Sequence, residues 1–194
     1  STFYIVLDVA ISILGAVSVP LYISSPPAEI DLILKETEAK LLLVGVPDII
    51  KRLAGLNLKI PVISFYRADP VGSSEQGIIG WQKFLNKGEG GEEINTAPVN
   101  FDDLVTIRYT SGTTGRVKGV CFTHEKLRWM AEALCSIMES WKARNQEVSY
   151  LSYLPMNHVL EGIITAYSPY YTPAPFHIYF LENMKDLQLS LIHI

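Results

Sequence analysis

Short apolar stretches alternate with amphipathic stretches over the first 66 residues, and this alternation limits the chain to one class of fold. LLLVG at 41–45 and IPVISFY at 60–66 are apolar at nearly every position, as strands covered on both faces of a sheet are. Helical spacing marks the segments between them, and Ser25 with two prolines suits a helix start. The order β-α-β-α-β predicts an α/β fold with a parallel sheet. We expect strands at 16–22, 41–45 and 60–66, and helices at 3–14, from Ser25, and at 47–55.

The opening run FYIVLDVAISILGAVSVPLYI is long and apolar enough to raise the alternatives of a membrane span or a signal peptide. Asp8 lies inside the run, and no basic residue precedes it. Gly15 and Pro20 divide it into a helix-like half and a β-branched half. We therefore expect a buried helix followed by a strand, and a cytoplasmic protein.

Composition excludes several classes of protein. A hydrophobic content of 48% with 19% charged residues indicates a globular fold, and a net charge of −4 gives no basic surface for nucleic acid. Cys121 and Cys135 lack the spacing of a zinc site or a disulfide framework, so we expect two core thiols in a reducing compartment.

The middle of the chain is more polar. Residues 67–100 predict exposed connections around one short helix, Trp81–Leu85, and GEGGEE at 88–93 predicts a solvated loop. A longer helix follows at 123–144, where Thr123 suits the N-cap and His124 is expected at the surface. One face of this helix predicts core packing through Leu127, Met130, Ala131, Leu134, Ile137, Met138 and Trp141.

The stretch YTSGTTGRVKGV, residues 109–120, combines hydroxyl residues, glycines and a lysine, which together suit a bound phosphate. It is no P-loop, because Val117 stands where that motif needs glycine and Gly119 stands where it needs Ser or Thr. DLVTIRY before it and VKGVCFT after it both predict strands, so we expect a loop between two β segments.

A second stretch, YLSYLPMNHVLEG at 150–162, begins as a strand that ends at Pro155. His158 and Glu161 follow the carboxyl end of this strand, where α/β sheets bind ligands. A lone histidine at a strand end is more often structural than functional, so both interpretations stay open on the residues alone.

Four blocks of the chain resemble, in the correct order, the adenylate-forming enzymes, which include acyl-CoA synthetases, amino-acid adenylation domains and beetle luciferases. YTSGTTGRVKGV resembles the phosphate-binding signature, with Val117 where the signature usually has proline. The others are THEKL, LSYLPMNHVLEG and ILGAVSVPLYISSPPAEIDLILKETEAKLLLVG, and the resemblance spans roughly residues 10 to 182. AVSVPLY and SYLPMNHVLEG are most similar to medium- and long-chain acyl-CoA synthetases.

The resemblance implies a reaction and a set of site residues. A carboxylate, here a fatty acid, would attack ATP to give acyl-AMP and pyrophosphate in the presence of Mg²⁺, and coenzyme A would then displace AMP. His158 and Lys118 would act in catalysis, and Glu161 would contact substrate. Arg108 and Arg116 flank the loop and could touch phosphate, although surface salt bridges are the simpler interpretation of both. The phosphates would be held by Thr110, Ser111, Gly112, Thr113, Thr114, Gly115 and Lys118.

The family's later blocks, which carry a magnesium-binding acid, a ribose-binding aspartate and a catalytic lysine on a small C-terminal domain, have no counterpart here. We therefore expect residues 1–188 to be an internal part of the large N-terminal domain. LSLIHI at 189–194 matches a sequencing adapter read in frame, and the rival interpretation is an apolar strand cut short. The aromatic stretch AYSPYYTPAPFHIYF suits either an acyl tunnel or core packing.

Two alternatives to a ligase remain at this stage. The chain as it stands could be a non-catalytic nucleotide-binding or structural remnant. It could also belong to an adenylating relative that passes the acyl group to a carrier protein, because the choice of acceptor depends mostly on sequence outside these blocks.

Overall fold

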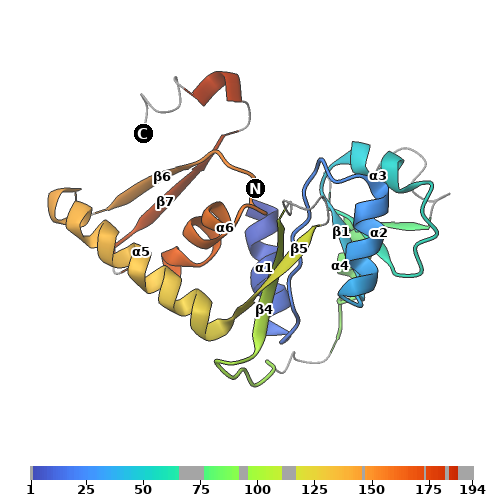
Figure 1. Cartoon of the computed structure of the whole chain (residues 1–194), viewed down its shortest axis with the longest axis horizontal. Helices are drawn as coiled ribbons and strands as arrows, with labels where there is room; N and C mark the ends of the chain where they lie inside the picture. The colour runs from blue at the N-terminus through green and yellow to red at the C-terminus, as the bar shows by residue number, and fades with distance from the viewer. Residues whose placement is uncertain are drawn as a thin grey trace. The chain divides into compact units, whose positions relative to one another are not determined.

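The computed structural model describes residues 2–65, 77–91, 96–110, 117–145, 147–172, 174–181 and 184–187, and it describes the backbone but not the side chains of 138–145. The chain divides into two compact units. One, the sheet unit, comprises residues 23–95, and the other, the hairpin unit, comprises residues 1–22 and 96–194. Figure 1 shows the elements of both.

The sheet unit is a small parallel α/β arrangement. Its three strands are hydrogen-bonded in chain order, and both neighbouring pairs are parallel. The first helix begins after Pro26 with a proline at its N-terminus, which fits the predicted start, and Ser25 Oγ donates to Glu29 Oε1 at 2.6 Å. The elements are α2 (Pro27–Glu36), β1 (Leu42–Val44), α3 (Pro47–Leu53), β2 (Val62–Ser64), β3 (Ile78–Gly80) and α4 (Trp81–Asn86).

The hairpin unit begins with helix α1 (Thr2–Ile13), which ends one residue before the predicted end and just before Gly15. Gly15 has a φ of 67°, its N–H donates to Ser12 O, and the Ala16 N–H donates to Ile11 O. These two bonds form a Schellman motif, which needs a left-handed residue at this position. The chain therefore turns sharply out of α1 toward residues 16–22.

Two long strands form an antiparallel pair at the centre of the hairpin unit. β4 (Leu104–Thr110) pairs with β5 (Lys118–Thr123), as the flanks of the glycine-rich loop predict. β5 leads directly into α5 (His124–Asn145), and the Lys126 N–H donates to Thr123 Oγ1 at 3.3 Å. The predicted N-cap role of Thr123 is thus confirmed.

The rest of the hairpin unit is a second, parallel pair of strands with a helix. β6 (Val148–Ser152) pairs in parallel with β7 (Phe176–Phe180), and α6 (Val159–Ala166) lies in the connection between them. α6 contacts both α5 and α1, as Figure 1 shows. Short 3-10 turns occur at Ser168–Tyr170 and Met184–Asp186. Val105, Leu127 and Ile163 are buried at the centre of an apolar cluster formed by β4, α5 and α6.

The predicted strand at 16–22 is wrong in its placement. Within this segment only Ser18 forms a β-bridge, and its partner is Thr106 of β4 rather than the parallel sheet of β1 and β2. The Ser18 N–H donates to Val105 O, and Ser18 O accepts from the N–H of Ile107 and from Thr106 Oγ1. Pro20 donates no backbone hydrogen bond, which helps to keep the ladder short.

Two expected core side chains are also exposed. Ile137 on α5 is 58% exposed, although Leu127 and Ala131 of the predicted stripe are buried. Cys121 is exposed on β5, whereas Cys135 is buried, with Sγ 3.3 Å from Ser168 O. Both errors come from assigning an apolar residue to the core without knowing which faces of its element have a partner.

The structure also bears on the alternative of a membrane span in the opening run. Among the described residues, no helix is long and apolar enough to cross a bilayer. α1 is 12 residues long, and its Asp8 is buried.

Candidate functional site

The structure brings two predicted phosphate ligands together at the open end of the β4–β5 pair. Thr110 is the last residue of β4, Lys118 is the first of β5, and the two are direct partners in the ladder. Both are exposed. The four-carbon side chain of Lys118 and the hydroxyl of Thr110 therefore flank the point where the glycine-rich loop leaves and returns. The other predicted ligands, Ser111, Gly112, Thr113, Thr114 and Gly115, and also Arg116, lie outside the described residues.

Gly119 allows this strand pair to pack closely. A Cβ added there would lie 3.0 Å from Ile107 Cγ2 and 3.2 Å from Tyr109 Cζ, which is tighter than ordinary side-chain contact. Tyr109, its partner across the ladder, is only 7% exposed. The small residue beside Lys118 therefore lets the Tyr109 ring pack against the backbone of β5.

His158 lies where the sequence predicts, beyond the carboxyl end of β6, in a parallel pair. It is exposed and occupies the N-cap position of α6, with φ −65° and ψ 133°. Its N–H donates to Pro155 O at 2.8 Å, and its carbonyl oxygen accepts from the Gly162 N–H at 2.9 Å. The backbone of His158 is thus held on both sides while its imidazole faces solvent.

Arg108 connects β4 to the segment that carries His158. Its Nη1 donates to Met156 O at 3.0 Å and lies 3.5 Å from His158 O. The side chain is only 2% exposed, so a surface salt bridge, the simpler interpretation from sequence, is wrong for Arg108. Arg108 and Thr110 are two residues apart on one strand and so lie on the same face. The His158 segment therefore packs on the face of β4 from which Thr110 projects.

Gly162 leaves the space that the Arg108 guanidinium occupies. A Cβ added at Gly162 would overlap with Cζ, Nη1 and Nη2 of Arg108. Gly162 lies in the first turn of α6, so the missing side chain lets the guanidinium approach the helix backbone.

Glu161 is fully buried, with 0% of its surface exposed. Its Oε2 accepts from Tyr150 Oη at 3.1 Å and from the Leu154 N–H at 3.3 Å, and its Oε1 accepts from Thr165 Oγ1 at 2.8 Å. These three donors come from β6, the segment after it and α6. The substrate role suggested for Glu161 stays a prediction, and the contacts of the carboxylate are internal.

Arg108 also lies near a buried polar cluster of Asp8, Tyr4 and Tyr167. Asp8 of α1 is 4% exposed, and its Oδ2 accepts from Tyr167 Oη at 2.6 Å. Burial, followed by the Asp8 charge, raises the pKa of the Tyr167 phenol far above its usual range, while the Arg108 charge opposes the rise. Burial, followed by the Asp8 charge, likewise raises the pKa of the Tyr4 phenol, and the nearby Arg108 opposes the rise. Asp8 and Arg108 therefore both lie near the Tyr4 and Tyr167 hydroxyls.

Two weak signals of this cluster are present in the sequence. Asp8 inside an apolar run and Arg108 inside an apolar strand were each a polar residue at a position that should be buried. Such a residue is either misplaced or paired. Because the pattern does not reveal the partner, only the structure could identify the pairing.

The described residues contain no group of three or more His, Cys, Asp or Glu side chains that could hold a metal ion.

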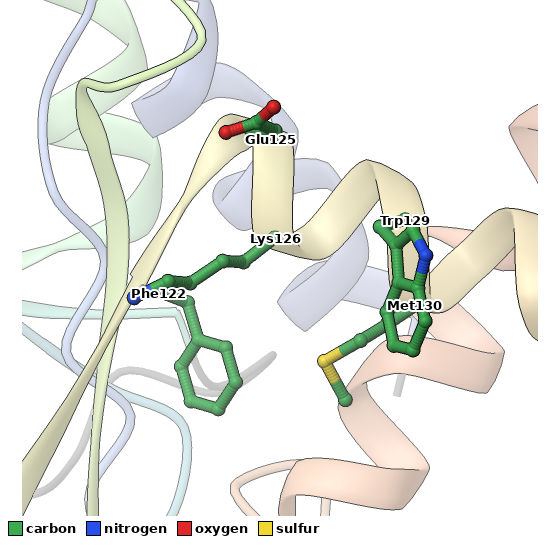
Figure 2. Close-up of a pocket in the computed structure, with 5 residues that line it drawn as sticks. All are labelled: Phe122, Glu125, Lys126, Trp129 and Met130. Carbon is green, nitrogen blue, oxygen red and sulfur yellow. The ribbon is translucent and has the colours of Figure 1, made fainter.

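A separate open pocket of about 350 Å³ lies where β5 meets α5. Figure 2 shows the Phe122 ring and the Met130 side chain facing each other, with Lys126 extending from α5 toward β5 past Phe122 and with Glu125 and Trp129 also on α5. Trp129 is 69% exposed. None of the predicted site residues lines this pocket.

Comparison with known proteins decides the family. The model of the family described as AMP-binding enzyme matches residues 1–191. The chain belongs to this family. The match includes the β4–β5 pair, His158 and the buried cluster, so these features are parts of an AMP-binding enzyme fold.

Individual members of the AMP-binding enzyme family show the same relationship. The chain is 35% identical over 152 residues to a 4-coumarate–CoA ligase-like protein of Oryza sativa subsp. japonica, covering 75% of this chain and 26% of that protein. It is 36% identical over 91 residues to a long chain acyl-CoA synthetase of Arabidopsis thaliana, covering 45% and 13%. These relatives place the chain with the acyl-CoA ligases of the family. The chain spans about a quarter of the first relative's length.

A solved structure agrees on the fold. ATP-bound MatB from Rhodopseudomonas palustris matches with a TM-score of 0.68 at 21% identity, over 100% of this chain and 36% of that one. At this identity the likeness concerns the fold alone.

Proposed function

We propose that this chain is the phosphate-loop portion of an ATP-dependent acyl-CoA ligase that activates a fatty acid of medium or long chain. The observation that supports the proposal most is the pairing of Thr110 with Lys118 at the loop, next to a segment bearing His158. Residues 1–188 would be part of a larger adenylation domain and 189–194 a non-native tail. Within the proposal, the protein is cytoplasmic and contacts membranes transiently to obtain its acid.

In the first step a carboxylate oxygen would attack the α-phosphorus of ATP, and pyrophosphate would leave with the bonding electron pair. Negative charge then grows on the leaving pyrophosphate. Lys118 would place its ammonium against that charge, and the hydroxyls and amides of Thr110, Ser111, Thr113 and Thr114 would donate hydrogen bonds. Gly112 and Gly115 would let the backbone close around the phosphates.

In the second step the thiolate of coenzyme A would attack the acyl carbonyl carbon and expel AMP. His158 would lie beside the acyl and phosphate pocket, with its imidazole free to contact either group. Mg²⁺, when bound with ATP, would screen the phosphate charge. The described residues offer it no ligand cluster, so the proposal assigns no residue here to the metal.

The test is carboxylate-dependent exchange of pyrophosphate into ATP by the complete reading frame that contains this chain. The acids should run from acetate through malonate and aryl acids to long-chain fatty acids, with amino acids included. We expect exchange with fatty acids and a loss of about 100-fold in Lys118→Ala, as for one preorganised donor. Lys126→Ala is the matched control, because this exposed lysine lies beyond the opposite end of β5.

The outcomes separate the alternatives. Exchange with a fatty acid followed by thioester formation with coenzyme A supports the proposal. Exchange without that thioester points to a carrier-protein acceptor. A folded, ATP-binding protein that exchanges with none of these acids sinks the ligase proposal and leaves a nucleotide-binding remnant.

A further inference from the structure

Two buried charged side chains meet the Leu154–His158 segment from opposite directions. Arg108 on β4 reaches carbonyl oxygens of the segment, and Glu161 on α6 reaches an amide N–H of the same segment. Both side chains are at most 2% exposed. A guanidinium can only donate and a carboxylate can only accept, so each satisfies the backbone groups that the other cannot.

The segment itself has little regular structure to hold it. It lies between the end of β6 at Ser152 and the start of α6 at Val159, and its local bond is the turn from the His158 N–H to Pro155 O. A short irregular segment of this kind can adopt several backbone conformations unless outside groups select one. Charge-assisted hydrogen bonds in a buried setting are strong enough to make that selection.

Because of where Arg108 lies, the backbone conformation of the Leu154–His158 segment is linked to the phosphate loop. Arg108 is two residues before Thr110, where the loop leaves β4. Its guanidinium bridges Met156 O and His158 O, so one side chain connects the base of the loop to the backbone of His158. Gly162 provides the necessary space, because any Cβ there would displace the guanidinium.

We propose that Arg108 and Glu161 are positioning residues, which together fix the Leu154–His158 segment and thereby the location of His158 relative to the phosphate loop. The catalytic consequence of this inference rests on the proposed function. That Arg108 and Glu161 fix the Leu154–His158 segment is a structural claim that does not depend on it. Asp8 is buried as well, and it lies with Arg108 near the Tyr167 hydroxyl.

The experiment compares Arg108→Met, Glu161→Gln and Gly162→Ala with wild type in the complete reading frame. Thr106→Val is the matched control. Thr106 is fully buried on the same face of β4 as Arg108, but its hydroxyl donates to Ser18 O instead of the His158 segment. Arg108→Lys keeps the charge and one donor, so it tests for partial rescue.

Three readouts are measured on each variant. Hydrogen exchange of peptides spanning residues 153–160 reports the order of the segment, whether or not the protein is active. NMR signals of the labelled His158 imidazole report its surroundings. Steady-state kinetics of pyrophosphate exchange into ATP give kcat and the KM for ATP.

We expect Arg108→Met, Glu161→Gln and Gly162→Ala to increase hydrogen exchange in residues 153–160 and to shift the NMR signals of His158. Each should also lower kcat by about 10-fold or more, while KM for ATP changes less than about 2-fold. Thr106→Val should leave all three readouts near wild type, and Arg108→Lys should recover part of kcat. Arg108→Met combined with Gly162→Ala should be no worse than the worse single variant, because both remove the same contact.

If hydrogen exchange in residues 153–160 is unchanged in all three variants, Arg108 and Glu161 do not fix the Leu154–His158 segment. If hydrogen exchange increases while kcat and the His158 NMR signals stay as in wild type, the segment is held by these residues but they do not position His158 for catalysis. If wild type adenylates no acid, the proposed function fails, while hydrogen exchange and the His158 signals still decide whether Arg108 and Glu161 position the segment.

Discussion

The sheet unit and the hairpin unit differ in what they bury. In the described part of residues 23–95, the fully buried polar residues are Ser25 and Ser64, and the rest of the core is aliphatic. The hairpin unit buries Asp8, Arg108 and Glu161. All the fully buried charged residues in the described chain thus belong to the unit that holds Thr110, Lys118 and His158.

This difference shows how the two units use their interiors. An aliphatic core stabilises by removing apolar surface from water and tolerates small adjustments. A buried charge adds little net stability, but it accepts only one arrangement of donors and acceptors. In the hairpin unit the buried Arg108 and Glu161 bind the backbone between β6 and α6, so its interior is specified by hydrogen bonds as well as by apolar packing.

The largest expected effect tests this reading of the hairpin unit. Glu161→Ala would leave Tyr150 Oη, the Leu154 N–H and Thr165 Oγ1 without their acceptor. At the usual cost of unsatisfied buried donors, unfolding free energy should fall by about 4 kcal/mol. Urea denaturation measures the change, and Thr165→Val, which removes one donor, is the milder comparison. A loss below about 1 kcal/mol would show that water replaces the carboxylate readily.

The next effect concerns the sheet unit. Ile63 on β2 is 1% exposed, and Ile63→Ala should cost about 3 kcal/mol through lost burial and the cavity left behind, while Ile63→Val should cost about 1 kcal/mol. Hydrogen exchange should increase in peptides from residues 23–95 and stay near wild type in peptides from β4 and β5. Equal loss of protection in both units would break the comparison, because they would then unfold as one.

A smaller effect should appear at alkaline pH and should come from the hairpin unit. Folding raises the pKa of Tyr4, Tyr150 and Tyr167 above the ordinary value of 10.0, mainly through burial. The native state therefore keeps these phenols protonated where the unfolded chain ionises them, so their contribution to stability is complete below pH 10 and declines above it. Unfolding free energy followed from about pH 8 to 11 should show the decline, with a shallower slope in Tyr167→Phe. If unfolding free energy declines with pH equally steeply in wild type and Tyr167→Phe, Tyr167 does not contribute to the decline.

The smallest effect sharpens the comparison at the start of α5. Thr123→Ala removes the side-chain acceptor of the Lys126 N–H and should lower unfolding free energy by about 1 kcal/mol, whereas Thr123→Ser should be nearly neutral. Thermal unfolding measures both. If Thr123→Ala is neutral and Thr123→Ser is not, the Thr123 methyl group matters more than the cap.

Much of the candidate site followed from local pattern. Strand residues on both sides of YTSGTTGRVKGV predicted a loop between two strands, and the ladder places Thr110 opposite Lys118. The strand ending before Pro155 placed His158 at its carboxyl end, as β6 confirms. The loop ligands from Ser111 to Gly115 lie outside the described chain and stay predictions.

The sequence by itself determined the α/β class, the parallel order of β1 and β2, the turn at Gly15 and the cap at Thr123, because each depends on residues close together in the chain. Tertiary structure alone decided that residues 16–22 meet β4, that Arg108 is interior and that Glu161 faces inward. Those outcomes depend on partners far along the chain: 48 residues separate Arg108 from Met156, and 159 separate Asp8 from Tyr167. Local periodicity shows that a position is buried, but the partner that permits a charge there is set only when distant elements pack.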